Sequence, residues 1–169
     1  MKIIALLRQD LSHPSTSATP ARIVPDSAMV LPGRPVFVPD MGSGWQGQPV
    51  VALRIGRLGR DIAPKFASRY VDAVTVALWL RLPAEDASLS AGLLDGLDAS
   101  LAAGTWIPAG ELPQTPLAVS TPCSEISVDL QAEIESAVPA VSRYMTLKMG
   151  DVILAGPAGR PVELTAGSR

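Results

Sequence analysis

Frequent prolines and glycines divide this sequence into short segments, which limits the length of any helix or strand. There are 16 prolines and 14 glycines among 169 residues, and both residue types mark turns. Short apolar and β-branched runs lie between them, such as 71–82 and 152–155. We therefore predict a mainly β fold with a few short helices, of the α+β class, in a single domain covering residues 1–169.

The periodicity and the turn residues place the expected elements along the chain. Prolines at both ends of 35–39 suit an edge strand, and the mostly apolar run 71–82 suits a buried central strand. A helix is expected at 129–137, ended by Pro139. The other predictions are strands at 2–7, 50–55, 104–107 and 152–155, a short helix at 63–70, helical turns within 84–103, and loops at 12–21 and 41–48.

Charge and composition exclude several classes of function. The net charge is −2 and the arginines are scattered, so we expect no nucleic-acid partner. The N-terminal apolar run 3–7 is too short for a signal sequence or a membrane span, and we predict a cytoplasmic protein that does not enter membranes. The single cysteine, Cys123, excludes an internal disulfide and is interpreted as a small side chain near a loop.

The segment 146–159 carries a recognisable motif. It reads TLKMGDVILAGPAG, a turn followed by a short strand and a second turn. It resembles the signature TLxxGDxIxTGTPAG of the fumarylacetoacetate hydrolase family, and 53–60, 65–70 and 72–76 resemble the family's central block in the same order. The resemblance implies a mixed β-sheet roll and divalent-metal chemistry on acylpyruvates and other 2-oxo acids.

The resemblance also implies a metal site whose ligands are changed in this chain. The family holds Mg²⁺ or Mn²⁺ with three carboxylates, and their positions fall on Gln48, Val50 and Trp79. These cations prefer negatively charged oxygen donors. An amide offers one neutral oxygen, valine offers no donor atom, and the indole N–H only donates. We therefore predict that the protein has no metal cofactor.

The acid-base and substrate positions implied by the resemblance are altered as well. His13 falls at the family's loop histidine, but the glutamate expected three residues later is Thr16, so the imidazole lacks its orienting partner. The family's lysine falls on Asp95, and the threonine of its second turn falls on Ala155. His13 is the one candidate catalytic residue.

Two further charged residues are assigned to the substrate pocket. Asp98 falls in a segment similar to the family's FDxxxPxGPW motif, although it could equally cap a turn. Arg81 could pair with Asp95 or with Asp98, or bind an anion.

Three functions follow. The first is a pseudoenzyme that binds a small ligand, such as a 2-oxo acid, or forms a homodimer or a heterodimer with an active paralogue. The second is an Mg- or Mn-dependent hydrolase, decarboxylase or isomerase of 2-oxo acids. The third is a structural protein whose pocket has closed around Trp79. The acids that could supply metal ligands for the second are Asp40, Glu85, Asp86, Asp95 and Asp98.

Overall fold

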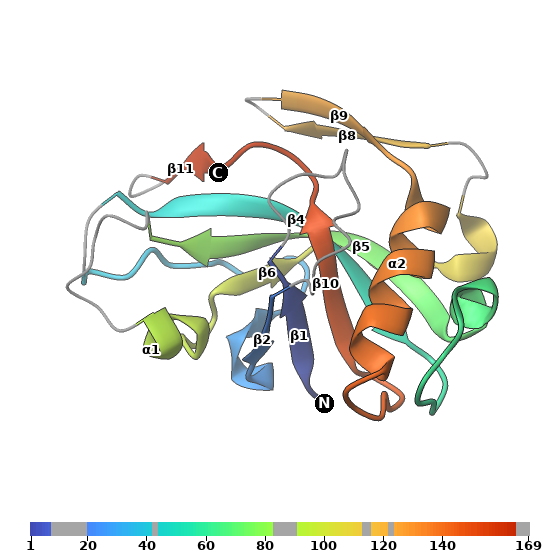
Figure 1. Ribbon diagram of the computed structural model, residues 1–169. Helices are drawn as coiled ribbons and strands as arrows, with labels where there is room; N and C mark the ends of the chain where they lie inside the picture. Colours follow the sequence, from blue (N-terminus) through green and yellow to red (C-terminus); the bar gives the residue numbers. More distant parts are fainter. Residues whose placement is uncertain (8–19, 42–43, 83–90, 113–115, 122–123, 165–169) are drawn as a thin grey trace.

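The fold is a mixed β-sheet that curls around a long helix (Figure 1). The computed structural model describes residues 1–7, 20–41, 44–82, 91–112, 116–121 and 124–164. Within these residues the main sheet has the strand order β2-β1-β10-β4-β5-β6-β3, with β11 paired to β4 and β7 paired to β5. The mainly β architecture predicted from the sequence is confirmed.

The elements have the following bounds. The strands are β1 Ile3–Leu6, β2 Ala21–Val24, β3 Met29–Val30, β4 Gln46–Ile55, β5 Val71–Arg81, β6 Leu101–Ala103, β7 Ile107–Pro108, β8 Leu117–Thr121, β9 Ser124–Val128, β10 Val152–Pro157 and β11 Val162–Glu163. The helices are α1 Ala91–Asp95 and α2 Leu130–Ser142, with 3-10 turns η1 Asp26–Ala28, η2 Pro64–Arg69 and η3 Ala109–Glu111.

Strands β4 and β5 form the centre of the sheet. They pair antiparallel along almost their whole length, from Gln46 opposite Arg81 to Ile55 opposite Val71. Both strands are mostly buried, because neighbouring strands and two layers of side chains cover them. The strands predicted at 50–55 and 71–82 are confirmed, and β4 begins four residues earlier than expected.

The sheet separates two apolar cores. On β1 the side chains alternate, so Ile4 and Leu6 pack in one core whereas Ile3 and Ala5 pack in the other. Helix α2 lies over the first face and buries Ile134, among other residues, against it (Figure 1). The second core, on the opposite face, carries the candidate site described below.

Helix α2 extends beyond its predicted end. Asp129 caps its N-terminus by accepting a hydrogen bond from the Ala132 amide at 3.1 Å. Pro139 was expected to end the helix, yet it lies inside the helix, which continues to Ser142. Burial of Val141 in the α2-side core offsets the missing amide hydrogen bond of the proline.

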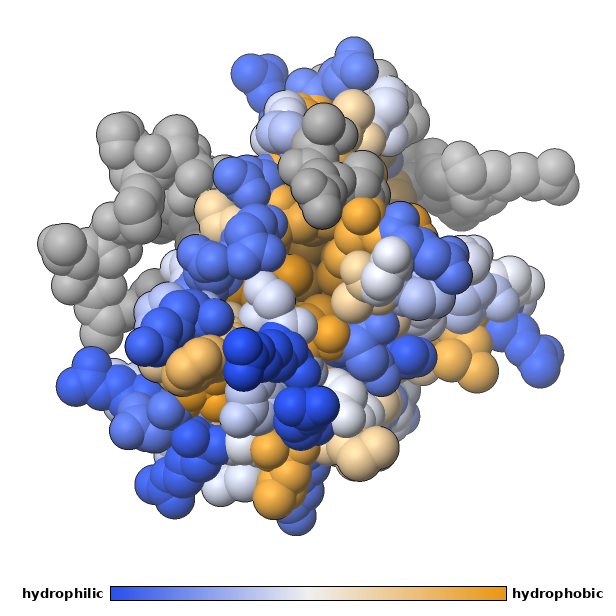
Figure 2. All heavy atoms as spheres, turned by 90° about the vertical axis from the view of Figure 1, so that its right-hand side faces the viewer, coloured by the Kyte–Doolittle hydropathy of each residue, from blue (hydrophilic) through white to orange (hydrophobic). Residues whose placement is uncertain are grey.

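A separate hairpin, β8–β9, stands above the main sheet (Figure 1). Val119 and Val128 anchor it in the α2-side core. Seen from that side, apolar side chains gather in a hollow just below the hairpin, with hydrophilic residues around it (Figure 2). The sequence gave no prediction for this segment.

Some predicted elements were wrong. Residues 35–39 form no strand, because prolines at both ends remove amide donors and no neighbouring strand pairs with them; Phe37 is 77% exposed. The stretch 84–103 contains strand β6 as well as helix α1, and its residues 84–90 lie outside the described part of the chain. Most of the expected loop 12–21, with His13, also lies outside it, as does Cys123.

Neither helix in the described part of the chain has the length and apolar content needed to cross a bilayer.

Candidate functional site

A cavity of about 720 Å³ opens on the sheet face opposite α2. Its walls come from the ends of β1, β4, β5 and β10 and from the turn that follows β10. Gln48, Val50 and Trp79 all line it. The three positions that the resemblance assigns to metal ligands are therefore brought together, in the order in which β4 and β5 pair.

The strand register explains how these side chains share one wall. Gln48 is directly opposite Trp79 in the β4–β5 ladder. Two residues along, Gln46 is opposite Arg81. Side chains two residues apart on a strand point to the same face, and directly opposed side chains are in contact range. The wall is thus a grid of two amides, an indole and a guanidinium.

Gln48 uses its amide to hold the turn that follows β10. Its Nε2 donates hydrogen bonds to the carbonyl oxygen of Gly159 at 2.9 Å and to that of Pro49 at 3.0 Å. Gly159 also lines the cavity. The side chain therefore bridges two walls of the cavity, a structural role for which a neutral donor is required.

Trp79 is almost completely buried beside this amide. Its side chain is 3% exposed, and its indole N–H has no hydrogen-bond partner. The guanidinium carbon of Arg81 lies 4.3 Å from the centroid of the indole ring, which is a cation–π contact. The residue at the third ligand position therefore supports a protein cation.

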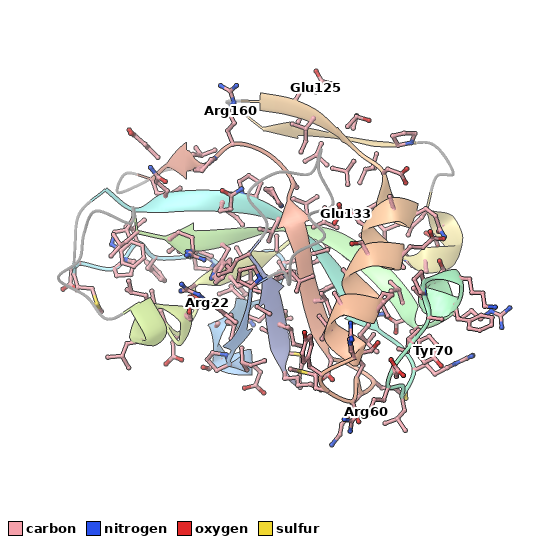
Figure 3. The ribbon with its side chains drawn as sticks, in the orientation of Figure 1. Arg22, Arg60, Tyr70, Glu125, Glu133 and Arg160 are labelled. Carbon is pink, nitrogen blue, oxygen red and sulfur yellow. The ribbon has the colours of Figure 1, made fainter. Side chains whose placement is uncertain are left out.

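Arg81 belongs to a half-buried cluster of three charges. Burial lowers the pKa of Arg81 below its usual value, the carboxylate of Asp95 opposes this effect, and the charge of Arg22 adds to it. Asp95 itself accepts a hydrogen bond from Arg22 at 2.7 Å. Figure 3 shows Arg22 between β2 and α1. Two cations thus share one buried carboxylate.

The structure distributes the other predicted site residues differently. Ala155 is fully buried in the α2-side core, so it does not line the cavity, whereas its neighbours Leu154 and Gly156 do. Asp98 is exposed and also outside the cavity wall. Asp95 reaches the site only through its charge, which acts on Arg81. His13 lies outside the described residues.

Sequence reasoning missed three residues. Gln46 and Arg160 line the cavity, and Arg22 completes the charge cluster. Gln46 could have been found, because it lies two residues before Gln48 and must share its face. Arg22 could not, because its contact with Asp95 joins residues 73 positions apart.

The residues of the cavity do not fit a divalent cation. Among the described residues no group of three or more His, Cys, Asp or Glu side chains is placed to hold a metal ion. The wall offers an amide that is already engaged, an apolar side chain and an indole donor, and a guanidinium adds positive charge beside them. Such a wall repels a dication instead of neutralising it.

Comparison with solved structures supports the fold. A 5-carboxymethyl-2-hydroxymuconate delta-isomerase from Mycobacterium smegmatis superposes with a TM-score of 0.78 at 21% identity, over 95% of this chain and 68% of that one. A maleylpyruvate hydrolase from Sphingobium sp. SYK-6, with manganese and pyruvate, gives 0.78 at 22% identity, over 98% and 63% of the two chains. A fumarylpyruvate hydrolase from Pseudomonas aeruginosa, with Mn²⁺ and pyruvate, gives 0.75 at 17%, over 93% and 77%.

Comparison of the sequence identifies the family. A search among curated proteins finds no match. The model of the fumarylacetoacetate (FAA) hydrolase C-terminal domain matches residues 7–169. The mixed sheet implied by the resemblance is present, and the structural neighbours include hydrolases and isomerases of the kind that the resemblance named. The chain therefore belongs to the fumarylacetoacetate hydrolase family.

Proposed function

We propose that this protein is a non-catalytic member of its family that binds a small molecule without a divalent metal. One observation carries the proposal: Gln48, Val50 and Trp79 share the wall of a single cavity, and none of them supplies a carboxylate. Loss of three negative oxygens removes most of the affinity for Mg²⁺ or Mn²⁺.

Retention of the cavity favours ligand binding over a purely structural role. Its volume of about 720 Å³ is within the range of small-molecule sites. Trp79 occupies part of the space beside Gln48, but the cavity is still open next to it. This finding is contrary to the alternative in which the pocket has closed.

A metal-dependent hydrolase or isomerase is the second candidate. It is favoured by the manganese and pyruvate recorded with two structural neighbours. It would need acids from elsewhere, yet Asp95 is paired with Arg22, and Asp40 and Asp98 are exposed away from the cavity wall. Glu85 and Asp86 lie outside the described residues.

Calorimetric titration with MgCl₂ and MnCl₂ distinguishes the two candidates. We expect no saturable heat of binding and no turnover of acylpyruvates that is sensitive to EDTA. Saturable binding of Mn²⁺ together with EDTA-sensitive turnover would establish the second candidate. A matched positive control is a family member that retains the Glu-x-Glu and Asp positions, titrated under the same conditions.

Association with another subunit belongs to the same proposal. A non-catalytic chain of this family could form a homodimer or pair with an active paralogue. Light scattering coupled to size-exclusion chromatography measures the mass of the protein alone and after mixing with such a paralogue. A single mass equal to that of one chain in both samples would exclude both forms.

A further inference from the structure

We propose that the cavity binds a small organic monocarboxylate directly on the guanidinium of Arg81, which supplies the positive charge that a metal would otherwise provide. This inference rests on the proposed metal-independent function and names the ligand class for the same cavity. The arguments concern the geometry of Arg81, the charge balance around it and the chemistry of the wall.

Arg81 is held in place at the cavity wall by a contact that uses none of its hydrogen-bond donors. Its guanidinium packs on the indole ring of Trp79 at 4.3 Å, and its position at the end of β5 is fixed by the pairing with Gln46. A cation–π contact engages the π face of the ring, so the five N–H donors keep their capacity. Such a preorganised guanidinium matches the two oxygens of a carboxylate.

The charge around Arg81 is not balanced within the described residues. Arg22 and Arg81 carry two positive charges, and Asp95 carries the one carboxylate of the cluster. Asp95 is 8% exposed and gives its short contact, 2.7 Å, to Arg22. No carboxylate in the described ranges forms an ion pair with Arg81. A half-buried cation of this kind is stabilised by an anion that enters the cavity.

The remaining wall indicates which anion fits. Leu6, Val50 and Leu154 are apolar, and Trp79 presents a buried N–H without a partner. The uncompensated charge of the cluster is a single positive charge, which matches one carboxylate better than a phosphate dianion. A carboxylate with a short apolar or 2-oxo body satisfies both parts of the wall.

Titration with carboxylates in the presence of EDTA tests the inference. The probes are pyruvate, propionate and inorganic phosphate, added at constant ionic strength to the purified protein and followed by calorimetry. We expect saturable binding of at least one of the two carboxylates and weaker binding of phosphate. Absence of saturable binding for both carboxylates, or a preference for phosphate, would overturn the inference.

Three variants give a pattern of signs that a general charge effect would not produce. Arg81→Gln should weaken carboxylate binding by about tenfold or more, because the charge-assisted hydrogen bonds are lost. Arg22→Gln should also weaken it, although Arg22 does not line the cavity, because Asp95 then becomes available to neutralise Arg81. Asp95→Asn should strengthen it. Arg69→Gln, on the exposed turn η2, is the control with the same change in net charge.

The outcomes separate this inference from the proposed function. Each variant is first checked for a cooperative thermal transition, so that misfolding is not read as lost binding. Unchanged affinity in Arg81→Gln would refute the role of Arg81 even if the protein binds no metal. Binding that appears only after Mn²⁺ is added would refute the proposed function as well.

Discussion

The guanidinium of Arg81 lies 4.3 Å from the centroid of the Trp79 ring, on the wall of the cavity that the central strands form. Trp79 falls at the position that the resemblance assigns to a metal-binding aspartate, so an aromatic ring holds a cation of the chain where a carboxylate would hold a metal ion. A single aspartate-to-tryptophan difference thereby changes both the donor set and the sign of the local charge.

The two parts of the Trp79 side chain make separate contributions. Trp79→Phe removes the buried N–H that lacks a partner but keeps an aromatic face for Arg81. The lost desolvation penalty offsets the smaller ring, so we expect a change in the free energy of unfolding within about 1 kcal/mol. Trp79→Ala, which removes the ring, should cost about 3–5 kcal/mol. Urea denaturation measures both, and an equal loss in the two variants would contradict this account.

Asp151 joins the N-terminal strand to the turn before β10. It is 2% exposed and accepts hydrogen bonds from the amide of Lys2 at 3.0 Å and from the amide of Lys148 at 2.7 Å, and it forms an ion pair with the Lys2 ammonium group. Asp151→Ala leaves these donors unpaired, and we expect a loss of about 2–4 kcal/mol in unfolding free energy.

The exposed pair of Arg54 and Asp72 is the matched control for Asp151. Their side chains are 40% and 45% exposed, so Asp72→Ala should cost less than about 1 kcal/mol. Equal losses in Asp72→Ala and Asp151→Ala, compared by thermal and urea unfolding, would show that the Asp151 network is not special.

Asp151 also predicts a dependence of stability on pH. Burial alone raises the pKa of its carboxyl, but the hydrogen bonds and charge of Lys2 and the amide of Lys148 together bring the pKa below its usual value. A pKa that is lower in the folded state adds stability above the ordinary aspartate pKa, and this stability is lost as the pH falls through the folded value. The urea midpoint should therefore fall in acid, and less steeply in Asp151→Asn.

Gly104 is required by the close approach of two backbone segments. A Cβ at this position would lie 2.8 Å from the carbonyl oxygen of Val76, which also accepts the hydrogen bond of the Gly104 amide. Backbone atoms of the central strand cannot move aside cheaply, so Gly104→Ala should cost about 1–3 kcal/mol. Gly110→Ala, where a Cβ meets nothing within 4 Å, is the control and should change stability little. Similar melting temperatures for the two variants would contradict the prediction.

Local sequence signals were sufficient for the elements that pack through regular patterns. The apolar run of β5 and the strand of β10 between its two turns were predictable because their neighbours along the chain define them. The strand predicted at 35–39 was wrong because a β-like composition cannot show whether a partner strand exists. The hairpin β8–β9 was missed because its strands contain Ser, Thr and Glu on the exposed side.

The candidate site was predictable only where its residues follow the strand pattern. Gln48, Val50 and Trp79 were found because β4 and β5 are continuous and their register is regular. Ala155 was expected at the pocket, but a register shift between Leu154 and Gly156 accompanies its burial in the opposite core. The Arg22 contact with Asp95 depends on tertiary packing, and no local pattern announces it.

Anomalous diffraction from crystals soaked in MnCl₂ tests the metal-independent function most directly. The cavity beside Gln48 and Trp79 should give no anomalous peak, and the Arg81 guanidinium should stay on the indole ring. A manganese peak within coordination distance of oxygen atoms from this wall would contradict the proposal that the family's metal has been lost.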